Sequence, residues 1–152
     1  MHARHLAQAG VVLMLLAPMG AIVRAEDDQT TDYVLKGIDE FVDQNYNAAI
    51  ADFTRAIEID PAFVPAYTNR AAVKYETGDY DGAIEDDTRA IELEPQNSMV
   101  YGLRATSENA QGNYAQAIAD WQKEIELNPS AQTKTQPRID EAQAKLNQGN
   151  AS

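Results

Sequence analysis

The chain has 152 residues, of which 44% are hydrophobic and 24% are charged, a composition typical of a single soluble globular domain and not of a disordered segment. Its formal net charge of −12 argues against nucleic acid and anionic membrane surfaces as partners, because neither attracts so acidic a chain. A basic partner would suit this charge, although acidic helix surfaces also serve solubility alone. The absence of cysteine excludes disulfides, thiol chemistry and lipid attachment through cysteine.

Residues 1–25 have the pattern of a secretory signal. The segment "MHARHLAQAG" carries Arg4 and no acid, and the apolar run that follows is short for a membrane span and is interrupted by a proline. Small residues end the segment where a signal peptidase requires them, which predicts cleavage after Ala25 and a secreted or periplasmic protein. A membrane anchor formed by residues 9–23 is the alternative. Residues 26–29 would then be a short linker.

The rest of the chain repeats with a period of 34 residues. The stretch "DYDGAIEDDTRAIELEP", which ends at Pro95, follows "NYNAAIADFTRAIEIDP" and precedes "NYAQAIADWQKEIELNP" at this interval. In each copy, alanine and isoleucine recur at helical spacing before a proline, which predicts an amphipathic helix. The preceding half of a unit, as in "VPAYTNRAAVKYETGD", predicts another helix that stops at a residue such as Gly78. The predicted units are residues 30–63, 64–97 and 98–131.

The C-terminal segment does not match a fourth unit in register. In residues 132–148, Ile139 and Ala142 belong to a narrow apolar stripe among polar residues, and Pro137 suits a first helical turn. This pattern predicts a capping helix over the open end of the third unit. Residues 149–152 are predicted to be a frayed tail.

The residue types that recur in all three units resemble those of the tetratricopeptide repeat family. A small residue occupies Gly37, Ala71 and Ala105, the turns read "QNY", "GDY" and "GNY", and each unit closes with a proline. The resemblance implies an all-α fold, a right-handed superhelical array of helix-turn-helix repeats whose first helices line a concave groove. In this fold the small residues let paired helices approach closely.

The family resemblance also implies a function. The expected protein is a non-enzymatic adaptor in the cell envelope that holds a partner peptide or helix in the groove, with apolar anchors. The alternative is a structural subunit of a larger assembly or homo-oligomer in which the repeat surface is buried. By resemblance, the groove residues are Val34, Ile38, Phe41, Thr68, Asn69, Ala72, Tyr75, Met99, Leu103 and Thr106.

One known mode of peptide binding in the family fits these groove residues poorly. Family members that clamp the acidic C-terminus of chaperones use lysine, arginine and asparagine in the groove. In this chain only Asn69 fits that pattern. The other slots hold Val34, Ile38, Met99 and Leu103. The sequence therefore argues against a carboxylate clamp.

No pattern in the sequence predicts catalysis, a cofactor or a metal site. Both histidines lie in the predicted signal segment, and no Gly-rich phosphate loop occurs. The acids Glu85, Asp86 and Asp87 are consecutive, so on a helix they point about 100° apart and do not converge on a cation. We therefore expect neither enzymatic activity nor a cofactor.

Charged residues also recur in register, and we expect them to form a structural network between repeats. Asp86 and Arg89 are three residues apart, a spacing that permits an ion pair, and Arg70 of the neighbouring helix could join them. The matching residues in the other units are Asp52 and Arg55, and Asp120, Lys123 and Arg104.

The second unit departs from the pattern at two positions. Asp87 occupies the slot that holds Phe53 and Trp121 in the other units, which the family fills with a large apolar side chain. Lys74 occupies a slot that often holds tyrosine in the family. Because the two slots face each other in the helical pair, we predict an ion pair between Lys74 and Asp87 in place of an aromatic contact.

The first unit leaves two arrangements open. In "YVLKGIDEFVDQ", the repeat register turns apolar residues such as Ile38 and Phe41 toward the groove, where they could form an exposed pocket for a partner. Alternatively, the first helix is rotated or its turn is shortened by one residue, so that these residues pack on Ile50 and Phe53. We favour the packed arrangement, because a terminal helix has no preceding repeat to fix its angle.

Overall fold

The structure is a computed structural model that describes residues 25–149, with residues 25–28 described by their backbone alone. Within this range the regular elements are all helices, and no strand occurs. The predicted signal segment, apart from Ala25, lies outside the described residues, as does the tail after Gly149. The helices are α2 (Ala25–Val42), α3 (Tyr46–Ile59), α4 (Val64–Glu76), α5 (Tyr80–Leu93), α6 (Ser98–Gln111), α7 (Tyr114–Leu127), the 3-10 helix η1 (Pro129–Ala131) and α8 (Gln132–Gly149).

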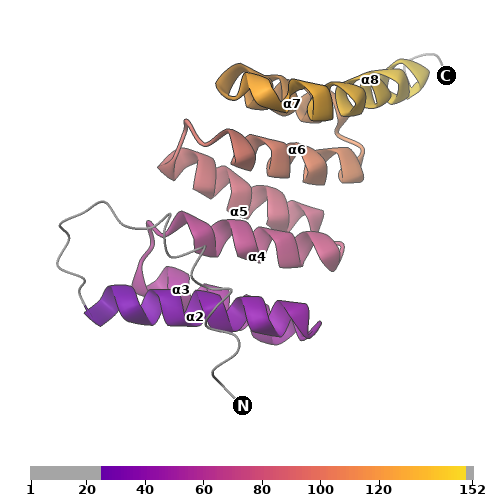
Figure 1. Ribbon diagram of the computed structural model, residues 1–152. Helices are drawn as coiled ribbons and strands as arrows, with labels where there is room; N and C mark the ends of the chain where they lie inside the picture. The colour runs from indigo at the N-terminus through magenta and orange to yellow at the C-terminus, as the bar shows by residue number, and fades with distance from the viewer. Residues whose placement is uncertain (1–24, 150–152) are drawn as a thin grey trace.

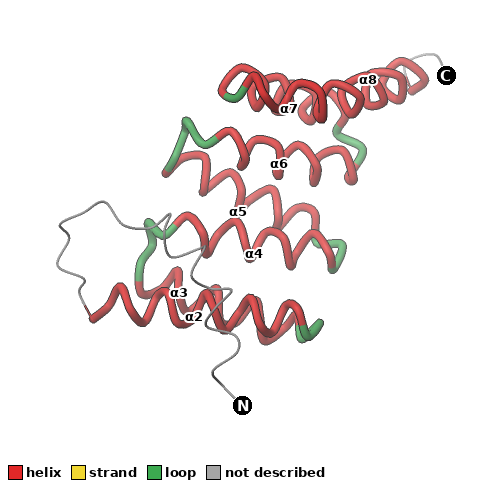
Figure 2. Tube along the Cα trace, viewed as in Figure 1, coloured by secondary structure: helices red, strands yellow, loops and turns green. Residues whose placement is uncertain are grey.

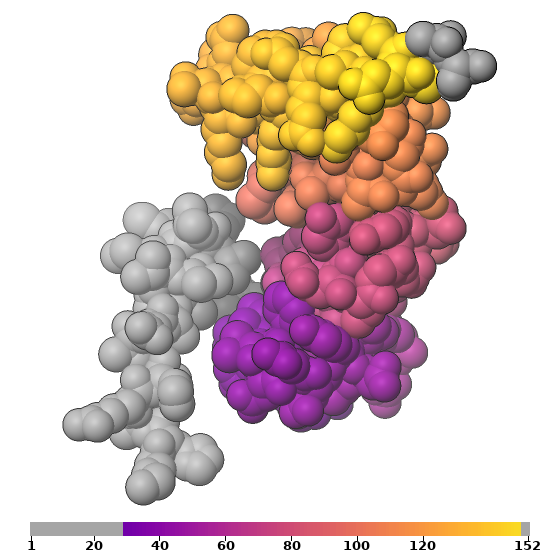
Figure 3. Space-filling view, turned by 90° about the vertical axis from the view of Figure 1, so that its right-hand side faces the viewer, coloured from indigo at the N-terminus to yellow at the C-terminus, as the bar shows by residue number. Residues whose placement is uncertain are grey.

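The helices form one stack of hairpins. Helix α2 packs on α3, α4 on α5 and α6 on α7, and successive hairpins meet where α3 packs on α4 and α5 on α6 (Figure 1). Short turns connect them (Figure 2). Helix α4 also contacts α2 and α6, so the first helices share one face of the stack, and the hairpins lie as successive layers (Figure 3). The predicted all-α array of helix-turn-helix units is confirmed.

The turn inside each hairpin has a left-handed residue at the same position. Gly78 and Gly112 have φ angles of 81° and 89°, and the first hairpin carries Gln44 there with a φ of 62°. The amide of Asn45 donates to the carbonyl of Glu40 at 2.8 Å and closes this turn as in the later hairpins. A residue with a Cβ is strained in the left-handed region, so Gln44 adopts a conformation that glycine adopts at lower energy.

The closest packing occurs where the two helices of a hairpin face each other. A Cβ on Gly37 would lie 2.7 Å from the ring of Phe53, so only glycine fits at this contact. Phe53 is completely buried, and Trp121 is 2% exposed at the same position of the third hairpin. The buried apolar side chains of the described residues form separate clusters around Phe53, around Trp121 and around Tyr67. Asp87, which replaces the aromatic residue in the second hairpin, belongs to none of them.

Helix α8 covers the end of the stack, as predicted for residues 132–148. It begins at Gln132, one repeat length after α6 begins, and packs on α7, so it takes the place of a further first helix despite its divergent sequence. Ile139 and Ala142 are buried in the Trp121 cluster. The placement of Pro137 in a first turn is wrong. This residue lies inside α8, and its lack of an N–H removes one backbone hydrogen bond there.

Two predicted boundaries at the chain ends are also wrong. Residues 26–29 belong to α2 and form no linker, because the acidic sequence at this point suits the first turn of a helix. Gly149 is the last residue of α8 instead of the first residue of a frayed tail. Glycine is a common residue at the end of a helix.

The first helix combines features of the two arrangements that the sequence left open. Its turn, residues 43–45, is as long as the turn of the second hairpin, residues 77–79, and Lys36 pairs with Asp52 at the sequence spacing of the later hairpins, so the repeat register holds. Ile38 and Phe41 nevertheless pack against the cluster around Phe53. The predicted rotation or shortening is therefore not needed to bury them, because both side chains reach the cluster from a helix that keeps its register.

The left-handed residue of the first turn leads to a stability prediction. Replacing Gln44 by glycine should raise the free energy of unfolding by about 0.5 to 1 kcal/mol, because glycine relieves the strain of a positive φ. Urea unfolding followed by circular dichroism measures the change. Gly78→Gln is the matched control and should lower stability by about 1 kcal/mol or more. Equal stability of Gln44→Gly and the natural protein would show that the first turn is not strained.

Candidate functional site

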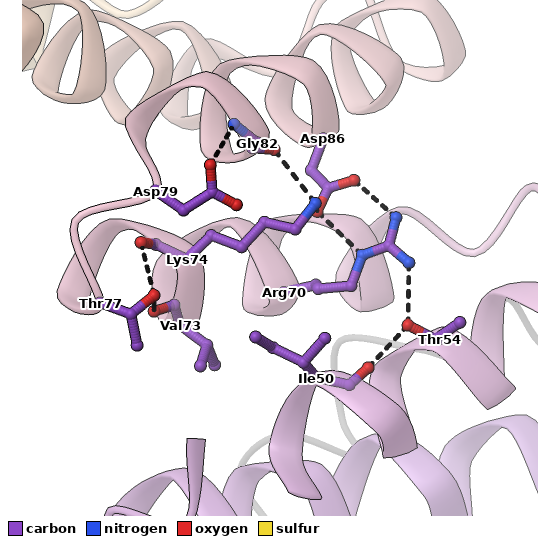
Figure 4. Close-up of polar contacts among 9 residues, drawn as sticks. All are labelled: Ile50, Thr54, Arg70, Val73, Lys74, Thr77, Asp79, Gly82 and Asp86. Carbon is purple, nitrogen blue, oxygen red and sulfur yellow. Dashed lines mark hydrogen bonds and ion pairs between the residues drawn. The ribbon is translucent and has the colours of Figure 1, made fainter. Parts of the chain in front are cut away.

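An ion pair joins the two helices of each hairpin at the same register. In the second hairpin, Arg70 of α4 donates to both carboxylate oxygens of Asp86 on α5, at 2.8 and 2.6 Å (Figure 4). Its remaining terminal nitrogen donates to the hydroxyl of Thr54 on α3 at 3.0 Å. The hydrogen bonds to Asp86 raise the pKa of Arg70. One guanidinium therefore connects three helices and two hairpins, through the bidentate geometry that suits arginine and carboxylate.

The other hairpins vary this ion pair. Arg104 donates to both oxygens of Asp120, at 2.6 and 2.9 Å, and to Thr88 at 3.1 Å. In the first hairpin, Lys36 reaches one oxygen of Asp52 at 2.8 Å, and the second oxygen has no hydrogen-bond partner among the described residues. Lysine lacks the planar fork with which arginine binds both oxygens. The predicted network between repeats is present in the second and third hairpins.

The ion pairs predicted within single helices form with other partners. Arg89 pairs with Glu92 at 2.8 Å, three residues further along α5, instead of with Asp86. Asp86 is buried and faces α4, whereas Arg89 is half exposed, so the two side chains leave the helix in different directions. The matching pairs in the other hairpins are Arg55–Glu58 and Lys123–Glu126.

The predicted ion pair between Lys74 and Asp87 is wrong. The ammonium of Lys74 lies 2.9 Å from Asp86 and donates to the carbonyl of Gly82 at 3.3 Å (Figure 4). Asp87 follows Asp86 directly, so its side chain points about 100° away around the helix axis. Asp87 is 1% exposed, and its Oδ1 has no hydrogen-bond partner in the described part of the chain. Burial, followed by the nearby charge of Asp86, raises the pKa of Asp87 to about 8.

Glu108 is a second buried acid without a full set of partners. It occupies the position in α6 that Lys74 occupies in α4, so an acid instead of a base lies near the carboxylate of Asp120. Burial, followed by the charge of Asp120, raises the pKa of Glu108 to about 7, although Arg104 opposes this shift. Its Oε2 has no hydrogen-bond partner within residues 25–149. Glu108 was not among the predicted site residues, although its place one repeat length after Lys74 distinguishes it in the sequence.

The first helices line a hollow of about 410 Å³ on their shared face. Among the predicted groove residues, three do not line it. Val34 is buried in the Phe53 cluster, Ile38 packs against that cluster, and Asn69 donates to the carbonyl of Pro65 at 2.7 Å. That the others bind a partner stays a prediction. The predicted residues that line the hollow are Phe41, Thr68, Ala72, Tyr75, Met99, Leu103 and Thr106.

The hollow also has polar walls that the sequence analysis missed. Asp87 of α5, Glu124 of α7, and Lys134 and Arg138 of α8 line it together with the first helices. The family resemblance implied a groove lined by first helices alone, and residues 132–148 were expected only to cap the third unit. The sequence feature that could have predicted the place of Arg138 is its distance of one repeat length from Arg104. The signal for Asp87 was the aromatic residue that its position holds in the other units.

The described residues offer neither a metal site nor a membrane-spanning helix. Within the residues that the structure describes, no group of histidines or acids could hold a metal ion, and no helix is long and apolar enough to cross a membrane. The consecutive acids Glu85, Asp86 and Asp87 separate as their helical spacing requires, since the first is exposed and the other two are buried.

The raised pKa of Asp87 predicts how stability depends on pH. The folded protein keeps this proton up to about pH 8, whereas the unfolded chain loses it near the ordinary value of 3.8. Because the folded state binds the extra proton between these values, the free energy of unfolding should fall as the pH rises through them. Asp87→Asn should weaken this fall, and Asp87→Phe should add about 2 kcal/mol of stability near pH 8. Urea unfolding at about pH 5 and pH 8.5 tests both variants. An unchanged pH dependence in Asp87→Asn would refute the burial of a protonated carboxyl.

The acid at position 108 predicts a charge reversal that stabilises the protein. Glu108→Lys should reproduce the pairing of Lys74 with Asp86 and raise the free energy of unfolding by about 1 to 2 kcal/mol near pH 8, where Glu108 is charged. Thermal unfolding by circular dichroism provides the measurement. Lys74→Glu is the converse control and should destabilise the second hairpin by a similar amount. A lower stability of Glu108→Lys would contradict the description of Glu108 as a buried acid that lies near Asp120 without a full set of partners.

Comparison with known proteins agrees with this architecture. A family model described as "TPR repeat" matches residues 39–78, and one described as "Tetratricopeptide repeat" matches residues 68–132. No curated protein matches the chain by sequence.

Several solved structures share the fold. The first TPR of Spaghetti (RPAP3), bound to the HSP90 peptide SRMEEVD, is 22% identical and superposes with a TM-score of 0.75 over 84% of this chain and 98% of its own. The Sgt2 TPR domain from Aspergillus fumigatus is 22% identical, with a TM-score of 0.76 over 86% and 88%. The TPR2B domain of yeast Sti1, in a pHsp70 complex, is 26% identical, with a TM-score of 0.67 over 80% and 98%. With the two family matches, which together span residues 39–132, the repeated hairpins show that the chain belongs to the tetratricopeptide repeat family.

Proposed function

We propose that the chain is a protein-interaction adaptor that binds a peptide or a helix of a protein partner in the hollow of its first helices. The hollow itself carries this proposal. It is open to solvent, its lining comes from helices of every hairpin and from α8, and Met99 at its edge is 58% exposed. An exposed large apolar side chain beside a hollow is typical of a surface that docks a partner.

The solved structures support peptide binding as the general role. The first TPR of Spaghetti (RPAP3) is bound to an HSP90 peptide, and the yeast Sti1 TPR2B domain is in a pHsp70 complex. Peptide recognition in this chain should differ from that of family members in which lysine, arginine and asparagine clamp an acidic C-terminus. Val34 and Ile38 pack into the core, and Asn69 is bonded to its own helix. An apolar or mixed peptide therefore suits this hollow better than an acidic terminus.

We also propose that the adaptor acts in the cell envelope or outside the cell. The support is the sequence of residues 1–25, with its basic start, apolar run and small residues before the predicted cleavage at Ala25. The acidic surface and the absence of cysteine suit such a compartment, because no thiol is exposed to oxidation. Cell fractionation, with N-terminal sequencing of the protein recovered from each fraction, tests the location and the cleavage.

Site-specific crosslinking tests the groove. A photoreactive amino acid at Tyr75, which lines the hollow, should capture a partner in cells, whereas the same amino acid at the exposed Glu126 of α7 should not. The crosslink at Tyr75 should weaken in a Leu103→Glu background, because a charge in the hollow opposes apolar anchors. Capture at both positions with equal yield would contradict binding in the groove.

The alternative role as a structural subunit predicts a different mass. The full chain has a mass of 16.7 kDa, and cleavage of the predicted signal would lower it. An adaptor that awaits a partner should have the mass of one chain when purified, whereas a subunit of a homo-oligomer should have a multiple of that mass. Light scattering after size-exclusion chromatography measures this. A stable oligomer whose only crosslink at Tyr75 joins two copies of the chain would favour the structural role.

A further inference from the structure

We propose that the partner inserts a lysine or arginine side chain into the hollow and that its cationic head binds the carboxyl of Asp87. This inference rests on the proposed function, because it specifies which peptide the hollow recognises. The aliphatic stem of the inserted side chain would lie along Tyr75 and Leu103, which line the same hollow as Asp87. Such a residue matches the site in length, in apolar character along the stem and in charge at the tip.

The space for this side chain arises from the repeat itself. The position of Asp87 holds Phe53 in the first hairpin and Trp121 in the third, and both rings are buried in their clusters. A carboxyl group is much smaller than either ring. The second hairpin contributes Asp87, Ala71 and neighbouring residues to the wall of the hollow instead of filling it with an aromatic side chain. Asp87, of which 1% is exposed, therefore lines the hollow at the place where the packing pattern is interrupted.

The carboxyl of Asp87 needs a donor that the described chain does not supply. Its Oδ1 is buried and lacks a hydrogen-bond partner in the part that the structure describes. Two bases of the neighbouring first helices are engaged elsewhere. Lys74 binds Asp86 and the carbonyl of Gly82, and Arg104 binds Asp120 and Thr88. A buried acceptor without a donor costs free energy, and a ligand that supplies the donor recovers it.

The other charges around the hollow leave this position open to a cation. Glu76 and Glu124 also line it, while Lys134 and Arg138 project from α8. Glu124 accepts a hydrogen bond from Thr135, and Arg138 lies over the ring of Trp121, so both have partners within the fold. The bases of α8 could attract an acidic peptide, which is the competing outcome of the experiment below.

The raised pKa of Asp87 predicts that the affinity for a cationic peptide depends on pH. Burial favours the protonated carboxyl most, the charges of Asp86 and Asp120 add to this effect and Arg104 opposes it, while Lys74 on α4 is engaged by Asp86. A cationic ligand favours the ionised form, so binding should release a proton between the ordinary pKa of 3.8 and the raised value of about 8. The affinity for a lysine-containing peptide should therefore increase with pH within this window.

Capped octapeptide pools test the inference on the full-length protein. Each pool has one fixed central residue, lysine, arginine, norleucine or glutamate, and neutral residues elsewhere, and binding is followed by ¹⁵N NMR at the amides of Tyr75 and Leu103. At about pH 8 the lysine and arginine pools should bind about tenfold more tightly than the norleucine pool, which has the same apolar stem without the charge. Asp87→Asn should reduce this preference to about twofold or less. Glu126→Gln is the matched control, because it removes an exposed acid of α7 that does not line the hollow and should keep the preference.

The outcomes separate this inference from the proposed function. If the norleucine pool binds as tightly as the lysine pool, or if Asp87→Asn keeps the full preference, the groove binds peptides but not through Asp87. If the glutamate pool binds most tightly, the bases of α8 select the peptide and the inference is wrong. If no pool shifts the amides of the hollow, both the inference and the peptide-binding function are wrong. A preference for lysine that grows from about pH 6 to pH 8.5 in the natural protein and not in Asp87→Asn supports the inference.

Discussion

The close approach of the two helices within each hairpin is the constraint on which the rest of the structure depends. In the first hairpin this approach requires glycine at position 37, because the ring of Phe53 occupies the place of a Cβ. The third hairpin meets the same constraint with Ala105 and Trp121, which share one cluster. The ion pairs between first and second helices then fall at one register, because the backbones are fixed at this contact. Stacking repeats this geometry and places the first helices on one face.

The second hairpin keeps this backbone geometry while it replaces the aromatic side chain by Asp87. Its ion pair is the most elaborate of those described, since Arg70 and Lys74 both bind Asp86. The adjacent carboxyl of Asp87 is left buried, without a donor, and in contact with the hollow. Natural sequences violate packing rules chiefly where function requires it. The interruption of the core and the candidate site are therefore the same feature of the molecule.

The sequence predicted the architecture well and the polar contacts poorly, for a physical reason. The three units follow from residues that recur every 34 positions, and the capping helix follows from the apolar stripe that contains Ile139 and Ala142. The partner of Lys74 depends instead on which of two adjacent carboxylates faces α4, a difference of about 100° around α5 that sequence spacing did not resolve.

The sequence also predicted the groove residues only in part. Tyr75 and Leu103 line the hollow as the family pattern implies, but Val34 is buried in the cluster around Phe53 and the partly buried Ile38 packs against that cluster. The contribution of α8 followed from its position one repeat length after α6, which its divergent sequence obscured.

The most direct test of this account is an NMR titration of the side-chain carboxyl carbon of Asp87 in the folded protein. The account requires a buried carboxyl without a donor, so it predicts a pKa of about 8. Assignment is straightforward, because Asp87→Asn removes the signal. Titration of this carboxyl near its ordinary value of 3.8 would mean that it is solvated or paired, and the hollow would then have no buried acid to offer a partner.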